Sequence, residues 1–216
     1  MNIGILGSGG VGKTLAKGFV QKGYGVILGT RDPQKPELRA WLANMPKGIS
    51  LGSFADAAFL GDVIIVATHW ENGATENALR LADPQNFASK VVLDTTNPVK
   101  FQNGQLTLDL AQTDSAGEMV QHWLPKARVV KAFNIVGAET MIHPQLQDGT
   151  ADMFIAGDDA DAKATATKLL QEFGWGVIDL GGIAQARWLE ALALIWIVYA
   201  QRNGWTRTHA FKLLRK

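Results

Sequence analysis

The sequence predicts an α/β protein built on a doubly wound parallel sheet, followed by a small C-terminal α/β lobe. Two observations support this fold class. Short apolar runs alternate with helical patterns from the N-terminus, and each run is apolar almost throughout, which is typical of strands buried on both faces of a parallel sheet. The predicted strands are Ile3–Leu6, Val26–Leu28, Val63–Ala67, Val91–Leu93 and Val129–Lys131. Helices between consecutive strands favour right-handed crossovers.

The segments between these strands carry helix signals. Asp32 directly before Pro33 predicts an N-cap followed by proline at the first helical position. Ser115 and Glu118 have the spacing of a capping box. The predicted helices are Gly10–Lys22, Pro33–Asn44, Phe54–Leu60, Glu71–Ala82 and Ala116–Trp123.

The pattern changes after residue 148, which predicts a dinucleotide-binding domain over residues 1–148 and a smaller lobe over 149–216. We expect the lobe to close over the carboxyl edge of the sheet. Its predicted elements are a strand at Met153–Ala156, a helix at Asp161–Phe173, a strand at Gly176–Leu180, a long helix at Ala184–Asn203 and a short helix at Thr206–Arg215.

The long C-terminal helix has an apolar stripe at three- and four-residue spacing, which predicts a face packed in the core of the lobe. The stripe consists of Trp188, Leu192, Ile195, Trp196 and Tyr199. The alternative is the seam of a homodimer, because further apolar residues make this helix hydrophobic nearly all round. Those residues are Leu189, Ala193, Ile197 and Ala200.

Composition excludes several classes. The chain has 216 residues, with 21 basic and 20 acidic side chains, so its net charge of +1 favours neither nucleic acid nor a membrane surface. Cysteine is absent and the four histidines lack metal-ligand spacing, so no metal site is expected. No basic leader precedes the first strand, and the apolar stretch Trp188–Ala200 is shorter than the roughly 20 residues that span a bilayer. We therefore expect a cytoplasmic protein.

A glycine-rich loop, Gly7-Ser8-Gly9-Gly10-Val11-Gly12, follows the first strand and opens the first helix. In this context G-x-G-x-x-G is the dinucleotide-binding fingerprint of a Rossmann fold. Gly7 allows the tight turn, Gly9 lets a pyrophosphate approach the backbone, and Gly12 allows close packing of helix and strand. The exposed amides and the positive helix end hold the anion.

The tip of the second strand predicts NADP(H) as the cofactor. NAD sites usually place an acidic residue there, but this chain has Thr30 and Arg31, with Lys35 one helical turn later, and Asp32 is interpreted as a helix cap. A guanidinium binds a phosphate with two parallel hydrogen bonds of roughly 1.5–3 kcal/mol each. We therefore expect a preference for NADP(H) over NAD(H) of about tenfold or more.

Ligands of such sheets bind outside the carboxyl ends of the strands. The residues that follow these ends are Thr68, His69 and Trp70, then Asn97 and Pro98, and then Ala132, Phe133 and Asn134. Trp70 is a candidate for the ribose or adenine side, and Asn97 or Asn134 for the nicotinamide amide. No catalytic residue is assigned. Lys131, His69 and Tyr199 are considered as proton donors, but hydride transfer needs mainly proximity and orientation.

Five blocks in the same order resemble the NADP oxidoreductases that work with the deazaflavin coenzyme F420, a family whose fold recurs in the six-transmembrane metalloreductases. The blocks are Gly7–Gly12, Thr30-Arg31 with Lys35, Asp94–Pro98, Lys131–Gly137 and Ala186–Glu190. The resemblance implies an NADPH-binding Rossmann domain, often dimeric, with a flavin-like partner stacked on the nicotinamide. It places pyrophosphate contacts on Ser8, Gly9, Gly10 and Val11, the 2′-phosphate on Thr30, Arg31 and Lys35, the ribose–adenine wall near Trp70, and nicotinamide neighbours near Pro98 and Ala132.

The sequence departs from the family pattern at three points. Thr30 stands where serine is usual, His69 precedes Trp70 where proline is typical, and no basic cluster is evident for a polyanionic deazaflavin tail. The first hypothesis is an oxidoreductase that moves hydride between NADP(H) and a deazaflavin, flavin or similar small acceptor. The alternative is an NADP(H)-binding redox sensor without turnover. A short relative of the β-hydroxyacid dehydrogenases ranks last, because those enzymes need a large helical second domain.

Overall fold

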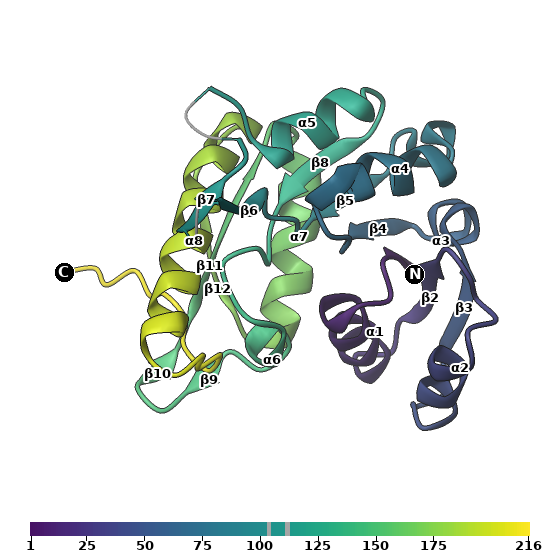
Figure 1. The fold of residues 1–216 in the computed structure, drawn as a ribbon, viewed down its shortest axis with the longest axis horizontal. Coiled ribbons are helices and arrows are strands. Elements are labelled where there is room, and N and C mark those ends of the chain that lie inside the picture. The colour runs from purple at the N-terminus through teal and green to yellow at the C-terminus, as the bar shows by residue number, and fades with distance from the viewer. Residues whose placement is uncertain (103–104, 111–112) are drawn as a thin grey trace.

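The computed structural model describes residues 1–102, 105–110 and 113–216 and contains an eight-stranded sheet flanked by helices on both faces (Figure 1). The strand order is β12-β11-β8-β5-β4-β1-β2-β3, and every pair is parallel except β11 with β8. The strands are β1 Asn2–Leu6, β2 Gly25–Thr30, β3 Ile49–Ser53, β4 Val63–Val66, β5 Val91–Asp94, β8 Arg128–Lys131, β11 Asp152–Gly157 and β12 Gly176–Asp179. The predicted doubly wound Rossmann class is confirmed.

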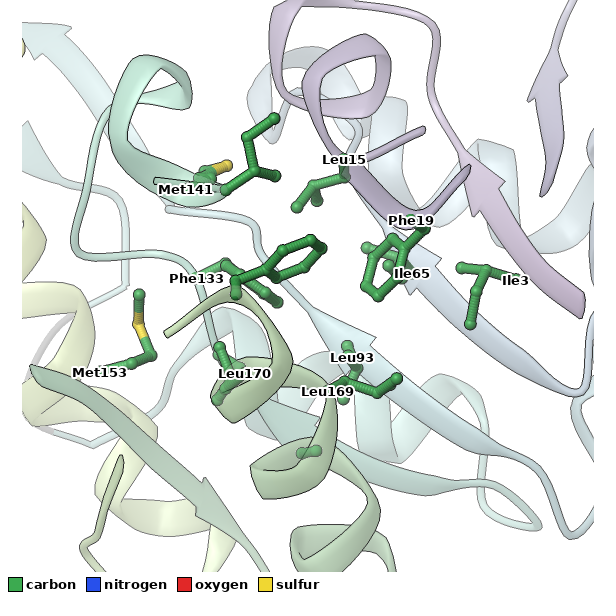
Figure 2. Packing of buried hydrophobic residues seen from close by; sticks show 14 of the residues in the cluster. Ile3, Leu15, Phe19, Ile65, Leu93, Phe133, Met141, Met153, Leu169 and Leu170 are labelled. Atoms are coloured by element: carbon green, nitrogen blue, oxygen red, sulfur yellow. The ribbon is translucent and has the colours of Figure 1, made fainter. Parts of the chain in front are cut away.

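Helices cover the sheet from both sides because the inner strands are apolar on both faces. The α-helices are α1 Gly10–Gln21, α2 Pro36–Ala43, α3 Phe54–Leu60, α4 Ala74–Leu81, α5 Ala116–Trp123, α6 Ala138–Met141, α7 Ala160–Phe173 and α8 Ala186–Arg202, with short 3-10 turns η1 Glu71–Gly73, η2 Pro84–Phe87 and η3 Ile183–Gln185. On one face α1, α6 and α7 bury Phe19, Met141 and Leu169 against the strands (Figure 2). On the other, α3, α4 and α5 bury a second cluster that includes Leu79 and Val120.

Two helix starts differ from the predictions. The first helical position of α2 is Pro36 rather than Pro33, and Asp32 instead accepts a hydrogen bond from the Gln34 amide at 2.9 Å, which stabilises a turn. The predicted helix Glu71–Ala82 is interrupted, because Asn72 and Gly73 have φ of 57° and 67°, so α4 begins only at Ala74. The cap at Ser115 is confirmed: its hydroxyl accepts from the Glu118 amide at 3.1 Å.

Strand β3 and two hairpins are not among the predicted elements. The sequence of β3, Ile-Ser-Leu-Gly-Ser, alternates apolar and small polar residues at the sheet edge, so it lacks the continuous apolar run of the inner strands. The hairpins are β6 Val99–Gln102 with β7 Gln105–Leu108, and β9 Gln145–Leu146 with β10 Gly149–Thr150.

The C-terminal part of the chain joins the same sheet. Strand β11 pairs antiparallel with β8, and β12 pairs parallel with β11, so these elements extend the sheet at its edge. A division of the chain at residues 148 and 149 stays a prediction. The predicted helix Thr206–Arg215 is wrong, because residues 206–216 form neither helix nor strand. This segment lies along β11 instead, where the Asp152 amide donates to the Phe211 carbonyl at 2.9 Å.

Helix α8 buries a different face from the predicted one. Trp188, Ile195 and Tyr199 are 60%, 58% and 52% exposed, and of the predicted stripe only Trp196 is buried. The buried face is Ala186, Leu189, Glu190, Ala193, Trp196 and Ala200. Leu189, Ala193 and Ala200, offered for a dimer seam, therefore pack within the monomer. By length and composition alone, Ile183–Arg202 would pass for a membrane span; here it packs against α5, β7 and β11 (Figure 1).

We predict that Phe211→Ala lowers the free energy of unfolding by about 2 kcal/mol, because the ring packs, partly buried, against the main core. The control is Leu214→Ala, three residues away and 81% exposed, for which the change stays within about 0.5 kcal/mol. Urea unfolding followed by tryptophan fluorescence measures both. Equal midpoints for the two variants would contradict the packing of this segment on the sheet.

Candidate functional site

The loop between β1 and α1 has the backbone geometry of an anion cradle. Gly7 has φ of 118°, a value that favours glycine, and its amide donates to the Gly29 carbonyl at 3.0 Å. A β-carbon on Gly12 would overlap the Gly7 carbonyl oxygen, whereas β-carbons on Gly9 and Gly10 would meet nothing within 4 Å. The open space thus lies over the first amides of α1, where the helix dipole favours an anion.

Two adjoining hollows extend from this loop along the carboxyl ends of the strands. The first, the Arg31 hollow, has a volume of about 310 Å³, and the second, the Trp70 hollow, about 350 Å³. They share Gly9, Ala67, Thr68 and His69 and so form one groove. The Arg31 hollow is completed by Gly7, Ser8, Thr30, Arg31, Lys35, Phe54, Ala74 and Asn77, and the Trp70 hollow by Gly10, Val11, Trp70, Glu71, Thr95, Thr96, Asn97, Val99 and Ile197.

The Arg31 hollow is basic. Arg31 and Lys35 are exposed at its rim, and the Ser8 hydroxyl donates to the Thr30 hydroxyl at 3.2 Å between β1 and β2. No carboxylate is among its described lining residues, although Lys35 lies 3.6 Å from the exposed Glu37 outside it. Phe54, Ala74 and Asn77 also line this hollow; sequence reasoning missed them because they lie at helix starts remote from any motif.

Trp70 and His69 differ in the hollows that they line. It lines the Trp70 hollow and not the Arg31 hollow, and its ring stacks on Trp123 with centroids 5.7 Å apart. Its assignment to the ribose–adenine side of the cofactor stays a prediction. His69 lines both hollows, and the Thr75 hydroxyl donates to the His69 carbonyl at 2.9 Å, which fixes this loop on α4.

Two asparagines form a bridge beneath the groove. Asn97 lines the Trp70 hollow and donates to the Asn134 carbonyl at 2.8 Å, while the Asn134 amide donates to Asn97 Oδ1 at 3.0 Å and to the Leu189 carbonyl at 2.9 Å. Asn134, Pro98 and Ala132 are buried and line neither hollow. Their role as cofactor contacts stays a prediction.

A buried ion network lies behind the same wall. Lys131 is fully buried, and its ammonium contacts Asp94 Oδ2 at 2.9 Å, Glu190 Oε1 at 2.7 Å and the Thr96 carbonyl. Its three protons therefore have three acceptors. Glu190 also accepts from the Ala116 and Gly117 amides at 3.0 and 3.1 Å, at the N-terminus of α5. Strands β5 and β8 and helices α5 and α8 meet at this one point.

The network keeps Lys131 charged. Burial by itself lowers the pKa of Lys131, but Asp94 and Glu190 outweigh burial and raise that pKa. Burial raises the pKa of Glu190, and the Lys131 ammonium offsets only part of this. Because Lys131 lines neither hollow, it is not a proton donor to the groove. Tyr199, whose ring packs on His209, also lines neither, so only His69 of the three considered donors lies there.

Val99 of β6 and Ile197 of α8 add apolar surface to the Trp70 hollow. No sequence motif places either residue at this site. Ile197 follows Glu190 by seven residues, two helical turns, so both lie on nearly the same side of α8. The ion network therefore fixes the rotation of α8 that turns Ile197 toward the groove. The sequence signal for this packing is Glu190, a carboxylate inside an otherwise apolar helix.

A glycine cradle followed by a basic end is typical of dinucleotide-dependent α/β proteins. Residues 2–98 match the family "NADP oxidoreductase coenzyme F420-dependent". A crystal structure of a candidate F420-dependent NADP-reductase from Arthrobacter sp. FB24 is 38% identical, with a TM-score of 0.92 over 100% of both chains. The chain therefore belongs to this family of NADP-dependent oxidoreductases.

Three further proteins share less sequence with this chain than that structure does. The F420-dependent NADP reductase of Methanothermobacter thermautotrophicus is 27% identical over 94% of this chain and 90% of that protein. Metalloreductase STEAP3 of Rattus norvegicus is 30% identical over 89% of this chain, which spans only 36% of the length of that protein. An imine reductase from Aspergillus terreus, at 19% identity and a TM-score of 0.67 over 94% of this chain and 63% of that one, shows the fold alone.

We predict that Lys131→Met lowers the free energy of unfolding by about 3–5 kcal/mol at neutral pH, because it leaves two buried carboxylates without their cation. The control is Lys163→Met, which removes the more exposed pair with Asp179 and costs less than about 1 kcal/mol. Chemical denaturation measures both.

The penalty in Lys131→Met depends on pH with a defined sign. Without the ammonium, the pKa of Glu190, already raised by burial, rises further above its unfolded value. A raised carboxyl pKa favours the folded state as protons bind, so the penalty is smaller at about pH 5 than at about pH 8. A penalty that grows on acidification would contradict the network.

Proposed function

We propose that the protein is an NADP(H)-dependent oxidoreductase that transfers hydride between NADP(H) and a flavin, deazaflavin or similar small acceptor. The observation that carries this proposal is the Arg31 hollow: Arg31 and Lys35 stand at the end of β2, without a lining carboxylate, beside the open amides of the glycine loop. This is the charge pattern that a 2′-phosphate requires and that a bare ribose hydroxyl does not.

Each part of the cofactor has a proposed place along the groove. The amides of Ser8, Gly9, Gly10 and Val11 would hold the pyrophosphate, because the loop leaves room over Gly9 and Gly10. Arg31 and Lys35, with the Thr30 hydroxyl, would hold the 2′-phosphate. The nicotinamide would lie in the Trp70 hollow beside Asn97, with Asn134, Pro98 and Ala132 as its predicted neighbours.

The side chains of the Trp70 hollow act by orientation and by exclusion of water. NADPH supplies a hydride when bound, and the acceptor takes up that hydride together with a proton from solvent. Trp70, Val99 and Ile197 cover the hollow with apolar surface, while Thr96 and Asn97 are held in place by Lys131 and Asn134. Proximity of the two rings then provides most of the catalysis.

We further propose that the protein works in the cytoplasm on a small-molecule acceptor, with no nucleic-acid or membrane partner. The near-neutral net charge of +1 supports this. A homodimer through α8 would use its outer face, where Trp188, Ile195 and Tyr199 are exposed.

Arg31→Ala should weaken NADPH binding about tenfold or more while leaving NADH binding unchanged, because only the 2′-phosphate loses its charge-assisted hydrogen bonds. Calorimetry measures both dissociation constants. Arg39→Ala is the matched control, since Arg39 is an exposed arginine of α2 outside both hollows. Unchanged NADPH affinity in Arg31→Ala would refute the cofactor assignment.

Oxidation of NADPH by the wild-type protein, followed by absorbance with a flavin or deazaflavin acceptor, tests turnover. NADPH binding without any oxidation would instead favour a redox sensor.

Gly9→Ala and Gly12→Ala should fail in different ways. A β-carbon on Gly9 meets nothing in the protein but occupies the space of the pyrophosphate, so we expect native stability and NADPH binding weakened by at least about tenfold. A β-carbon on Gly12 overlaps the Gly7 carbonyl, so this variant loses about 1–3 kcal/mol of stability or more. Thermal unfolding and calorimetry separate the two effects. Wild-type NADPH affinity in Gly9→Ala would show that the pyrophosphate binds elsewhere.

A further inference from the structure

A third hollow continues the groove beyond Trp70. This Lys100 hollow has a volume of about 310 Å³ and shares Trp70, Glu71 and Val99 with the Trp70 hollow. It shares no lining residue with the Arg31 hollow. The three hollows therefore follow one another, with the Trp70 hollow in the middle. If NADP(H) occupies the Arg31 hollow and only the adjoining part of the Trp70 hollow, the substituents of an acceptor in the remaining part extend into the Lys100 hollow.

The two ends of this groove have opposite charge. The Arg31 hollow is lined by Arg31 and Lys35, whereas the Lys100 hollow is lined by two carboxylates, Glu71 and Asp109, and one cation, Lys100. That cation is already neutralised, because Lys100 Nζ lies 2.6 Å from Asp109 Oδ1. The hydrogen bond from Lys100 also holds the pKa of Asp109 below its usual value, so this carboxylate stays ionised.

The described lining of the acceptor end holds one lysine and no arginine. Among the described residues that line the Trp70 and Lys100 hollows, Lys100 is the only lysine or arginine. The four positions outside the described ranges are Asn103, Gly104, Ala111 and Gln112, which are uncharged. A phosphate or a polycarboxylate at this end would face Glu71 without a free counter-charge.

The walls of the middle hollow suit a flat ring. Trp70 is held by its stack on Trp123, with an interplanar angle of 22°, and Val99 and Ile197 add aliphatic surface. Aromatic and aliphatic faces of this kind bind a planar heterocycle through dispersion and burial of apolar surface.

We propose, on the basis of the proposed function, that the acceptor is a planar ring whose substituent carries no negative charge, such as riboflavin or deazariboflavin. The ring lies in the Trp70 hollow beside the nicotinamide, and the uncharged chain extends past Glu71 into the Lys100 hollow. One hydride from NADPH and one proton from solvent reduce the ring, so both electrons leave the nicotinamide and enter the acceptor. FMN and coenzyme F420 carry ionised tails and bind less well.

The test compares acceptors that share a ring and differ in tail charge: riboflavin with FMN, and deazariboflavin with coenzyme F420. Fluorescence quenching measures their dissociation constants for the NADP⁺-loaded protein, and NADPH oxidation gives their KM values. We expect the uncharged member of each pair to bind at least about threefold more tightly at low ionic strength, as Coulomb repulsion near a protein surface predicts. The difference should shrink as salt is added.

Glu71→Lys should abolish or reverse this discrimination. Glu76→Lys makes the same change of charge on the exposed surface of α4, lines none of the three hollows, and should keep the wild-type preference. The pair separates a local effect at the acceptor end from a change in net charge.

Equal or tighter binding of FMN and coenzyme F420 by the wild-type protein overturns the proposal. The same shift in Glu71→Lys and Glu76→Lys also overturns it, as does failure of all four compounds to bind. Discrimination in binding without NADPH oxidation supports the acceptor class but contradicts the oxidoreductase function. Faster oxidation with the phosphorylated members leaves that function standing and refutes the acceptor class.

Discussion

The ammonium of Lys131 is the interaction on which the site depends. It is fully buried, and burial of a lone cation is strongly unfavourable, so the fold must bring acceptors to it. Asp94 comes from the neighbouring strand β5, while Glu190 comes from α8. Because Glu190 also accepts from two amides at the N-terminus of α5, the network joins two strands and two helices. This one cluster consequently fixes the positions of Thr96 and Ile197, which line the groove.

The two ends of the groove differ in charge because of the order of the elements along the sheet. Parallel strands place all their carboxyl ends at one edge, so β1, β2, β4 and β5 contribute adjacent loops to the same groove. The loop after β2 contributes Arg31, whereas the segment after β4 contributes Glu71 and the residue after β7 is Asp109. A ligand with a phosphate at one end therefore has one favourable direction in this groove.

Local signals predicted the parts of this molecule that local physics determines. The glycine loop, the inner strands and the Ser115 cap depend on backbone conformation and on short-range hydrogen bonds, and the structure has them where the sequence indicated. Periodicity showed that α8 has apolar faces but not which face is inside. The buried face is determined by the Lys131 ammonium and the carboxylates of Asp94 and Glu190, which are distant in sequence. The prediction that Trp188 and Tyr199 lie on the buried face is therefore wrong, since both are exposed.

The same limit explains the missed parts of the site. The side chains of Val99 and Ile197 reach the groove only through the β6–β7 hairpin and the docking of α8, and Asn134 was predicted as a ligand contact although tertiary packing uses both of its amide protons. Asp32 and Pro33 matched a cap pattern, but Lys35 and Pro36 begin the helix three residues later. Long-range contacts therefore decide what Val99, Ile197 and Asn134 do, whereas at Asp32 a local turn replaces the predicted helix cap.

In the proposed arrangement, different parts of the groove determine the specificity for the cofactor and the specificity for the acceptor. The predicted grip on the cofactor uses β1, β2 and the start of α1, whereas the acceptor end is built from η1, β6, the residues after β7, and α8. Since the Arg31 and Lys100 hollows share no lining residue, a change in acceptor chemistry does not require a change at Arg31. What both ends share is the middle of the groove, where Thr96 and Asn97 are fixed by Lys131 and Asn134. A single rigid centre with two independently variable ends is therefore sufficient to keep one cofactor while the acceptor differs.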